Sequence, residues 1–127
     1  ALVLSLAECR YANLAKARLE RADLTGASLE GATLTRAHLK GGETNMTKAH
    51  LKDAILLRAD LKGTNLQRAD LTGANLQGAY LEDANLHGAH LEDAYFRNTH
   101  LDGADLSGAT GLTDDQLLQA STKGTVP

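Results

Sequence analysis

The chain has 127 residues, a length typical of one domain, and 43% of them are hydrophobic although only 3% are aromatic. This composition excludes an ordinary globular core, which needs more aromatic and β-branched volume. The net charge of −3 argues against general nucleic-acid binding, and the single cysteine excludes an internal disulfide framework.

The first residues, 1–7, are apolar, but they lack the basic flank of a signal peptide and are too short to cross a membrane. We therefore expect no membrane insertion. Leu2, Leu4 and Leu6 alternate along this segment, so the N-terminal end is a candidate surface for end-to-end self-association. The expected state is otherwise a monomer.

A five-residue repeat extends over roughly residues 2–110. Its centre recurs from Leu4 to Leu39 and again from Met46 to Leu106, which gives 21 repeats, 18 of them centred on Leu. Alanine lies two positions before the centre in 17 repeats. Neither a helix nor a strand keeps a period of five on one face, so the chain must turn once per repeat.

Two further positions of the repeat fit a turn. Asn or Asp directly precedes the centre in nine repeats, and these side chains bond to nearby backbone at corners. Gly follows the centre by two positions in nine repeats, and it allows turn angles that are costly for other residues. Cys9, Met46 and Phe96 occupy centres, so we expect them to be buried.

The A-(D/N)-L-x-x pattern, as in residues 22–26 (ADLTG) and 74–78 (ANLQG), resembles the pentapeptide-repeat family. The resemblance implies an all-β fold, a right-handed quadrilateral β-helix solenoid of about five coils, each about 4.8 Å from the next. It also implies four pentapeptides per coil, with the centre and the preceding Ala facing inward. We expect this β-helix over residues 1–110.

The repeat is interrupted once. Leu39 and Met46 are seven residues apart, so two extra residues lie within 40–45. We expect a small loop at a corner after two coils, and the alternative is a protrusion that binds a partner.

A capping helix is predicted over residues 111–121. Thr113 is the expected N-cap, Gln116 closes a capping box, and Leu112 with Leu117 forms a hydrophobic staple. This helix would cover the C-terminal end of the solenoid, and residues 122–127 are expected to form a frayed tail.

Four repeats per coil place surface residues in columns. Two columns hold residue types found in hydrolase triads or metal sites: Glu8, Ser28, His50, Asp70 and His90 in one, and His38, Asp60, Tyr80 and His100 in the other. We reject catalysis because the repeats offer neither a strained nucleophile nor an oxyanion hole. Metal binding is disfavoured because ligands on three coils hardly reach one ion. No catalytic, cofactor-binding or metal-binding residue is therefore assigned.

Charge is distributed unevenly. Residues 1–63 have a net charge of +3 and residues 64–127 of −6. A third column contains a basic stripe of Lys16, Arg36 and Arg58. The stripe is either solvated surface or a contact for an anion or a nucleic acid. The lack of interleaved aromatic residues argues against the nucleic-acid contact. Tyr11, Tyr80 and Tyr95 are expected to point outward as contacts for a partner.

These features favour a non-catalytic structural or protein-interaction scaffold without a cofactor, whose protein partner the sequence does not identify. The resemblance offers an alternative, a DNA-mimicking topoisomerase (gyrase) inhibitor or quinolone-protection factor. The basic first half and the single central Phe depart from that subset. The family also suggests a bacterial, cyanobacterial-type source. The expected compartment is the cytoplasm, or the periplasm or thylakoid lumen if an upstream signal was removed.

Overall fold

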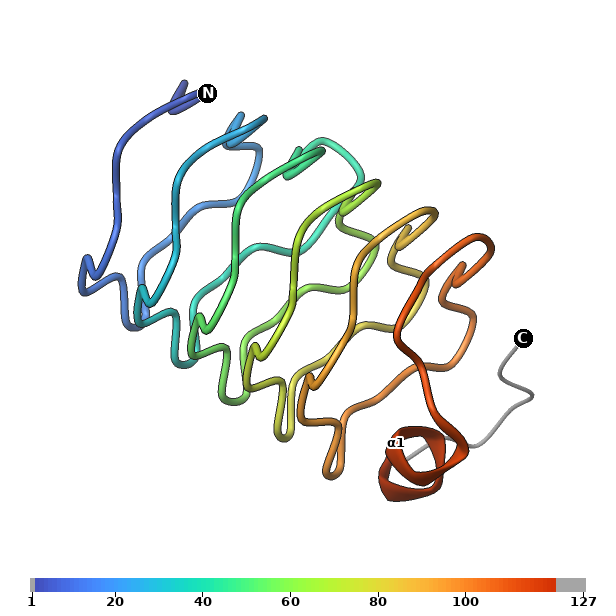
Figure 1. The fold of residues 1–127 in the computed structure, drawn as a ribbon. Coiled ribbons are helices and arrows are strands. Elements are labelled where there is room, and N and C mark those ends of the chain that lie inside the picture. Colours follow the sequence, from blue (N-terminus) through green and yellow to red (C-terminus); the bar gives the residue numbers. More distant parts are fainter. Residues whose placement is uncertain (1, 121–127) are drawn as a thin grey trace.

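The computed structural model describes residues 2–120, which wind into a solenoid of successive coils with one short helix at the C-terminal end (Figure 1). Isolated parallel bridges join the residue before each centre to its counterpart one coil further on. In the first coil these bridges are Val3 to Asp23, Glu8 to Ser28, Asn13 to Thr33 and Arg18 to His38. A coil therefore contains 20 residues, or four repeats.

Backbone hydrogen bonds run between coils in both directions. The N–H of Leu51 donates to the Asp70 carbonyl of the next coil at 2.7 Å, and the Asp70 N–H donates back to Ala49 at 2.9 Å. The same pair of bonds recurs from coil to coil, so the polar backbone groups are satisfied although the chain forms no long strand in residues 2–120.

Leu and Ala fill the interior. Central residues from Leu19 to Leu106 are at most 5% exposed, and Met46 and Phe96 are fully buried as predicted. Cys9 is an exception, because it packs against the core but is only half-buried. The prediction of full burial was wrong for Cys9 because no coil within the described residues lies over the first one.

Every repeat turns through a left-handed residue two positions after its centre. These 21 positions have φ between 53° and 73°, except for Gly41 at 109°. The N–H three positions after the centre donates back to it, as in Ala54 to Leu51 at 3.0 Å, which is the pattern of a type II β-turn. Nine of the positions are Gly, but twelve are not, and a side chain costs about 1–2 kcal/mol there.

The Asn and Asp residues before the centres bond to the backbone as predicted. All nine accept a hydrogen bond from the N–H two residues later, for example Asn75 from Gln77 at 3.1 Å. Where the acceptor is Asp and the donating residue is Thr or Ser, the hydroxyl donates a second bond, as Thr25 does to Asp23 at 2.7 Å. This second bond is the first cause, ahead of the backbone bond, of a lowered pKa of Asp23.

The two extra residues lie at the corner after the second coil, where they were expected. Bridges across this point join residues 22 apart, such as His38 to Asp60, and the spacing of 20 resumes from Asn45 to Asn65. The coils above and below therefore stay in register.

Two buried threonines occupy the usual Ala position at this corner. They repair the hydrogen bonding, because their hydroxyls bond to backbone groups whose usual partners are lost at the insertion. The Thr44 hydroxyl accepts from the Arg21 N–H at 2.9 Å and donates to the Lys40 carbonyl at 3.2 Å, linking two groups that the insertion separates. The Thr64 hydroxyl donates to the Leu39 carbonyl. That carbonyl has lost its usual donor, because the Thr44 N–H bonds to Gly41 instead.

The helix α1, Asp114–Gln119, lies at the C-terminal end of the solenoid, beside its last coil (Figure 1). The predicted capping box of Thr113 and Gln116 is present, and Leu112 and Leu117 pack against the core. The Gln116 side-chain amide also donates to the carbonyls of Leu91 and Ala94, both at 3.1 Å. The last predicted helical residue, 121, and the predicted tail, 122–127, lie outside the described residues. Within residues 2–120, no helix is long and apolar enough to cross a membrane.

Candidate functional site

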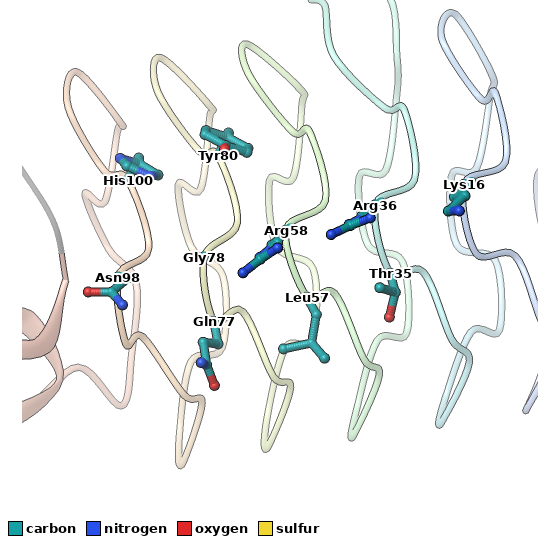
Figure 2. Close-up of a pocket in the computed structure, with 10 residues that line it drawn as sticks. All are labelled: Lys16, Thr35, Arg36, Leu57, Arg58, Gln77, Gly78, Tyr80, Asn98 and His100. Atoms are coloured by element: carbon teal, nitrogen blue, oxygen red, sulfur yellow. The ribbon is translucent and has the colours of Figure 1, made fainter.

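The basic stripe predicted from the sequence is present on one corner of the solenoid. Lys16, Arg36 and Arg58 occupy the left-handed position of three successive coils. Their N–H groups donate to the next coil at Thr35 (2.9 Å), Leu57 (2.8 Å) and Gln77 (3.0 Å). The three cations therefore rise by one coil spacing at each step, as Figure 2 shows.

Among residues 2–120, no carboxylate forms an ion pair with these cations. The two ion pairs in residues 2–120 join Arg10 to Glu30 at 2.6 Å and Arg21 to Glu43 at 3.2 Å, both elsewhere on the surface. Lys16, Arg36 and Arg58 are exposed, so their charges are available to a ligand in solution.

The backbone makes this arrangement costly. The three residues have φ of 60°, 56° and 53°, in the left-handed region where glycine is favoured. The solenoid has four columns of such positions. In each of the other three columns, any three successive positions among the described residues include at least one Gly. The column of Lys16 thus combines three strained residues with mutual charge repulsion. Strain that persists in one place is typical of functional surfaces.

Aromatic rings extend the stripe toward the C-terminal end. Tyr80 and His100 stack with ring centroids 4.8 Å apart and planes 2° from parallel, and Lys62 Nζ lies 5.1 Å from the centroid of Tyr80. Both rings come from the column next to the basic stripe, across the corner (Figure 2). Because the two columns are separate in the sequence, the column of cations was predicted to lack interleaved aromatic residues.

The three cations together with Tyr80 and His100 line a shallow groove of about 680 Å³, called the basic groove below. Lys16, Arg36 and Arg58 lie at its N-terminal part, and Tyr80, Asn98 and His100 at its C-terminal part. Arg58 lies across Gly78 of the next coil, where an added Cβ would be 3.1 Å from the Arg58 Cγ. Gly78 therefore leaves the space in which the Arg58 side chain extends along the groove.

The column that resembles a hydrolase triad is not organised for catalysis. Ser28, His50 and Asp70 line a depression of about 300 Å³, but no hydrogen bond joins these side chains. Asp70 instead accepts from the Thr72 hydroxyl at 2.6 Å and from its N–H at 3.0 Å. Burial disfavours ionisation of Asp70, but these bonds and the nearby His90 and His50 outweigh it, so its pKa lies below the ordinary value.

The residues considered as metal ligands are not brought together as a site. Within residues 2–120, no group of three His, Cys, Asp or Glu side chains is placed to hold an ion. His90 Nδ1 instead lies 3.1 Å from the Thr110 hydroxyl, and His100 stacks on Tyr80.

Two other surfaces carry exposed groups. A groove of about 870 Å³ beside α1 contains Tyr95, which is 62% exposed, and four carboxylates: Asp53, Glu92, Asp93 and Asp115. The N-terminal end exposes Leu2, Val3, Leu6 and Tyr11. Tyr80 is half-buried by its stack, so of the three tyrosines only Tyr11 and Tyr95 are as exposed as predicted.

Comparisons with known proteins agree with the repeat. The model of the family described as pentapeptide repeats matches residues 3–41, 44–83 and 74–110. A search of curated protein sequences found no match.

Among solved structures, the chain is similar to Rfr23, a pentapeptide repeat protein from the cyanobacterium Cyanothece 51142, with 35% identity over 81% of this chain and a TM-score of 0.46. The chain spans 58% of the length of Rfr23. It is also similar to a pentapeptide repeat protein from the Arabidopsis thaliana thylakoid lumen, with 33% identity over 79% of this chain, 74% of that chain and a TM-score of 0.41. QnrB1, a plasmid-mediated fluoroquinolone resistance protein, is 21% identical over 70% of this chain and 58% of its own, with a TM-score of 0.45.

Proposed function

Because the chain belongs to the pentapeptide repeat family, we propose that it is a non-catalytic scaffold whose basic groove binds a negatively charged segment of another protein. One observation carries this proposal. Lys16, Arg36 and Arg58 keep three unpaired charges at successive left-handed positions, where glycine would relieve both strain and repulsion.

The shape of the groove supports a protein partner. It is open and shallow, so a small molecule would stay mostly in contact with water, whereas pockets for small ligands usually bury most of the ligand. Tyr80 and Leu57 add apolar surface among the cations, as aromatic and arginine residues do in protein interfaces.

The test is a binding titration with a fluorescent poly-glutamate peptide, which has no fixed conformation near neutral pH. The double variant Arg36→Ala with Arg58→Ala should lose binding. The matched control is Lys48→Ala with Arg68→Ala, since those cations lie on two successive coils of another column and also have positive φ. Equal binding by the two double variants would mean that the basic groove is not the working surface.

The topoisomerase alternative rests on the acidic groove beside α1, where Asp53, Glu92, Asp93 and Asp115 gather. One feature counts against it. A surface that binds DNA is positively charged, so it would repel the cations of the basic groove. A gyrase supercoiling assay with and without a quinolone separates the two functions, because inhibition or protection would favour the alternative.

Finer features of the molecule remain proposals. We propose a right-handed quadrilateral β-helix, and the four columns of bridges support its four sides. The division into a repeat domain (1–110), a capping helix (111–121) and a tail (122–127), a monomeric state and a cytoplasmic location are proposed on the sequence alone, with end-to-end association through the N-terminal end as the alternative to a monomer.

A further inference from the structure

The spacing of the cations in the basic groove restricts the conformation of its partner. Lys16, Arg36 and Arg58 lie on coils joined by backbone bonds of 2.8–3.0 Å. Hydrogen-bonded parallel segments are about 4.8 Å apart, so the three side chains start about 10 Å apart from first to last. Pairing with all three cations in similar side-chain conformations therefore requires anionic groups at nearly this interval.

An α-helix meets this requirement and an extended strand does not. Carboxylates at helix positions i, i+4 and i+7 lie on one face and span about 10.5 Å, within about 1 Å of the span of the cations. Carboxylates on one face of a strand recur about every 6.7 Å, so three of them span about 13.4 Å. The third would miss its cation by about 4 Å.

We propose that the basic groove binds an α-helix of another protein, lying along the solenoid axis with one carboxylate per turn. This inference rests on the proposed function and adds the fold of the bound segment. Lys16, Arg36 and Arg58 each pair with one carboxylate, and the flexible arginine side chains absorb the small difference between helix pitch and coil spacing.

The rest of the groove sets the length and the apolar contact of that helix. From Lys16 to His100 the groove crosses four coil steps, or about 19 Å, which corresponds to about 13 helical residues. Past Arg58 it offers Gln77, Tyr80, Asn98 and His100 and no further cation. One turn beyond the last carboxylate, the helix therefore carries an apolar or aromatic side chain that packs against Tyr80.

The test compares two labelled peptides of about 15 residues with the same composition on an Ala/Gln background. One has Glu at i, i+4 and i+7, and the other has Glu at i, i+2 and i+4, so that its middle carboxylate points away from the helix face that the other two share. Binding is measured by fluorescence anisotropy at low salt with the unmodified protein, the Arg36→Ala/Arg58→Ala variant and the Lys48→Ala/Arg68→Ala control. A single-stranded oligothymidylate is the third probe.

The expected result is that the i, i+4, i+7 peptide binds more tightly than its isomer. Its affinity should fall about tenfold in the groove variant and stay within about twofold in the control. Equal, groove-dependent binding of both peptides would overturn the helix inference and leave the scaffold function standing. If neither peptide needs the groove, or if the oligonucleotide binds there more tightly than either, both the inference and the proposed function are wrong.

Discussion

Replacing Thr64 with valine tests whether a buried hydroxyl compensates for the two extra residues. The Thr64 side chain is fully buried, and its hydroxyl donates to the Leu39 carbonyl. Among the described residues no backbone N–H donates to that carbonyl. Valine has nearly the same shape, so the change removes one hydrogen bond and leaves a buried carbonyl unpaired, at a cost of about 1–3 kcal/mol.

Thr99 provides the matched control. It is fully buried at the same position of its repeat, and its hydroxyl donates to the Leu76 carbonyl at 2.6 Å. That carbonyl also accepts the Ala79 N–H at 2.9 Å, so it stays paired when Thr99 becomes valine. The loss should then be only about 0.5–1 kcal/mol.

Urea unfolding followed by far-ultraviolet circular dichroism measures both free energies, provided that the slope with urea is unchanged. Deleting Gly41 and Gly42 restores the five-residue spacing, and in that background Thr64→Val should cost no more than Thr99→Val. Equal destabilisation by the two valine variants in the chain that retains Gly41 and Gly42 would refute the repair role of Thr64.

Three further changes test other parts of the argument. Leu71→Lys places a charge in the fully buried interior and should unfold the middle coils; an unchanged thermal midpoint would contradict its inward position. Thr113→Ala removes the N-cap of α1 and should lower the free energy of unfolding by about 1 kcal/mol in urea titrations, and no change would show that the helix adds nothing to stability. Because the pKa of Asp70 is lowered in the folded state, its carboxylate adds to the free energy of unfolding above the unfolded pKa of about 3.9. This added stability is lost as the pH falls through the folded pKa. Asp70→Asn should therefore reduce the loss of thermal stability between pH 7 and pH 3, and an identical loss in the variant would contradict this assignment.

Much of the fold follows from local sequence rules. A five-residue period leaves only a chain that turns in every repeat, and side chains such as Asn75 then have one backbone N–H within reach. The capping box of Thr113 and Gln116 is equally local, so it too was predicted correctly. The position of the insertion followed from counting four repeats per coil.

Features that depend on contacts between coils could not be predicted in the same way. Propensity places Gly at left-handed turns, yet Lys48 adopts φ of 60° because the bonds to the neighbouring coils fix the backbone. The repair role of Thr64 needs the knowledge that the Leu39 carbonyl has lost its donor. The basic groove likewise joins two columns across a corner, whereas Arg58 and Tyr80 belong to different columns of the repeat pattern.

The threonines at the insertion also constrain the order in which this corner could have evolved. Thr99 occupies the same repeat position where no residues have been added, so a threonine is compatible with an ordinary corner. Two residues added at a corner with alanine in the next coil would leave a carbonyl like that of Leu39 without a donor at once. Threonine first and insertion second is therefore the path on which no intermediate has that unpaired carbonyl, and an alanine-to-threonine change in a regular repeat prepares that corner to accept a loop.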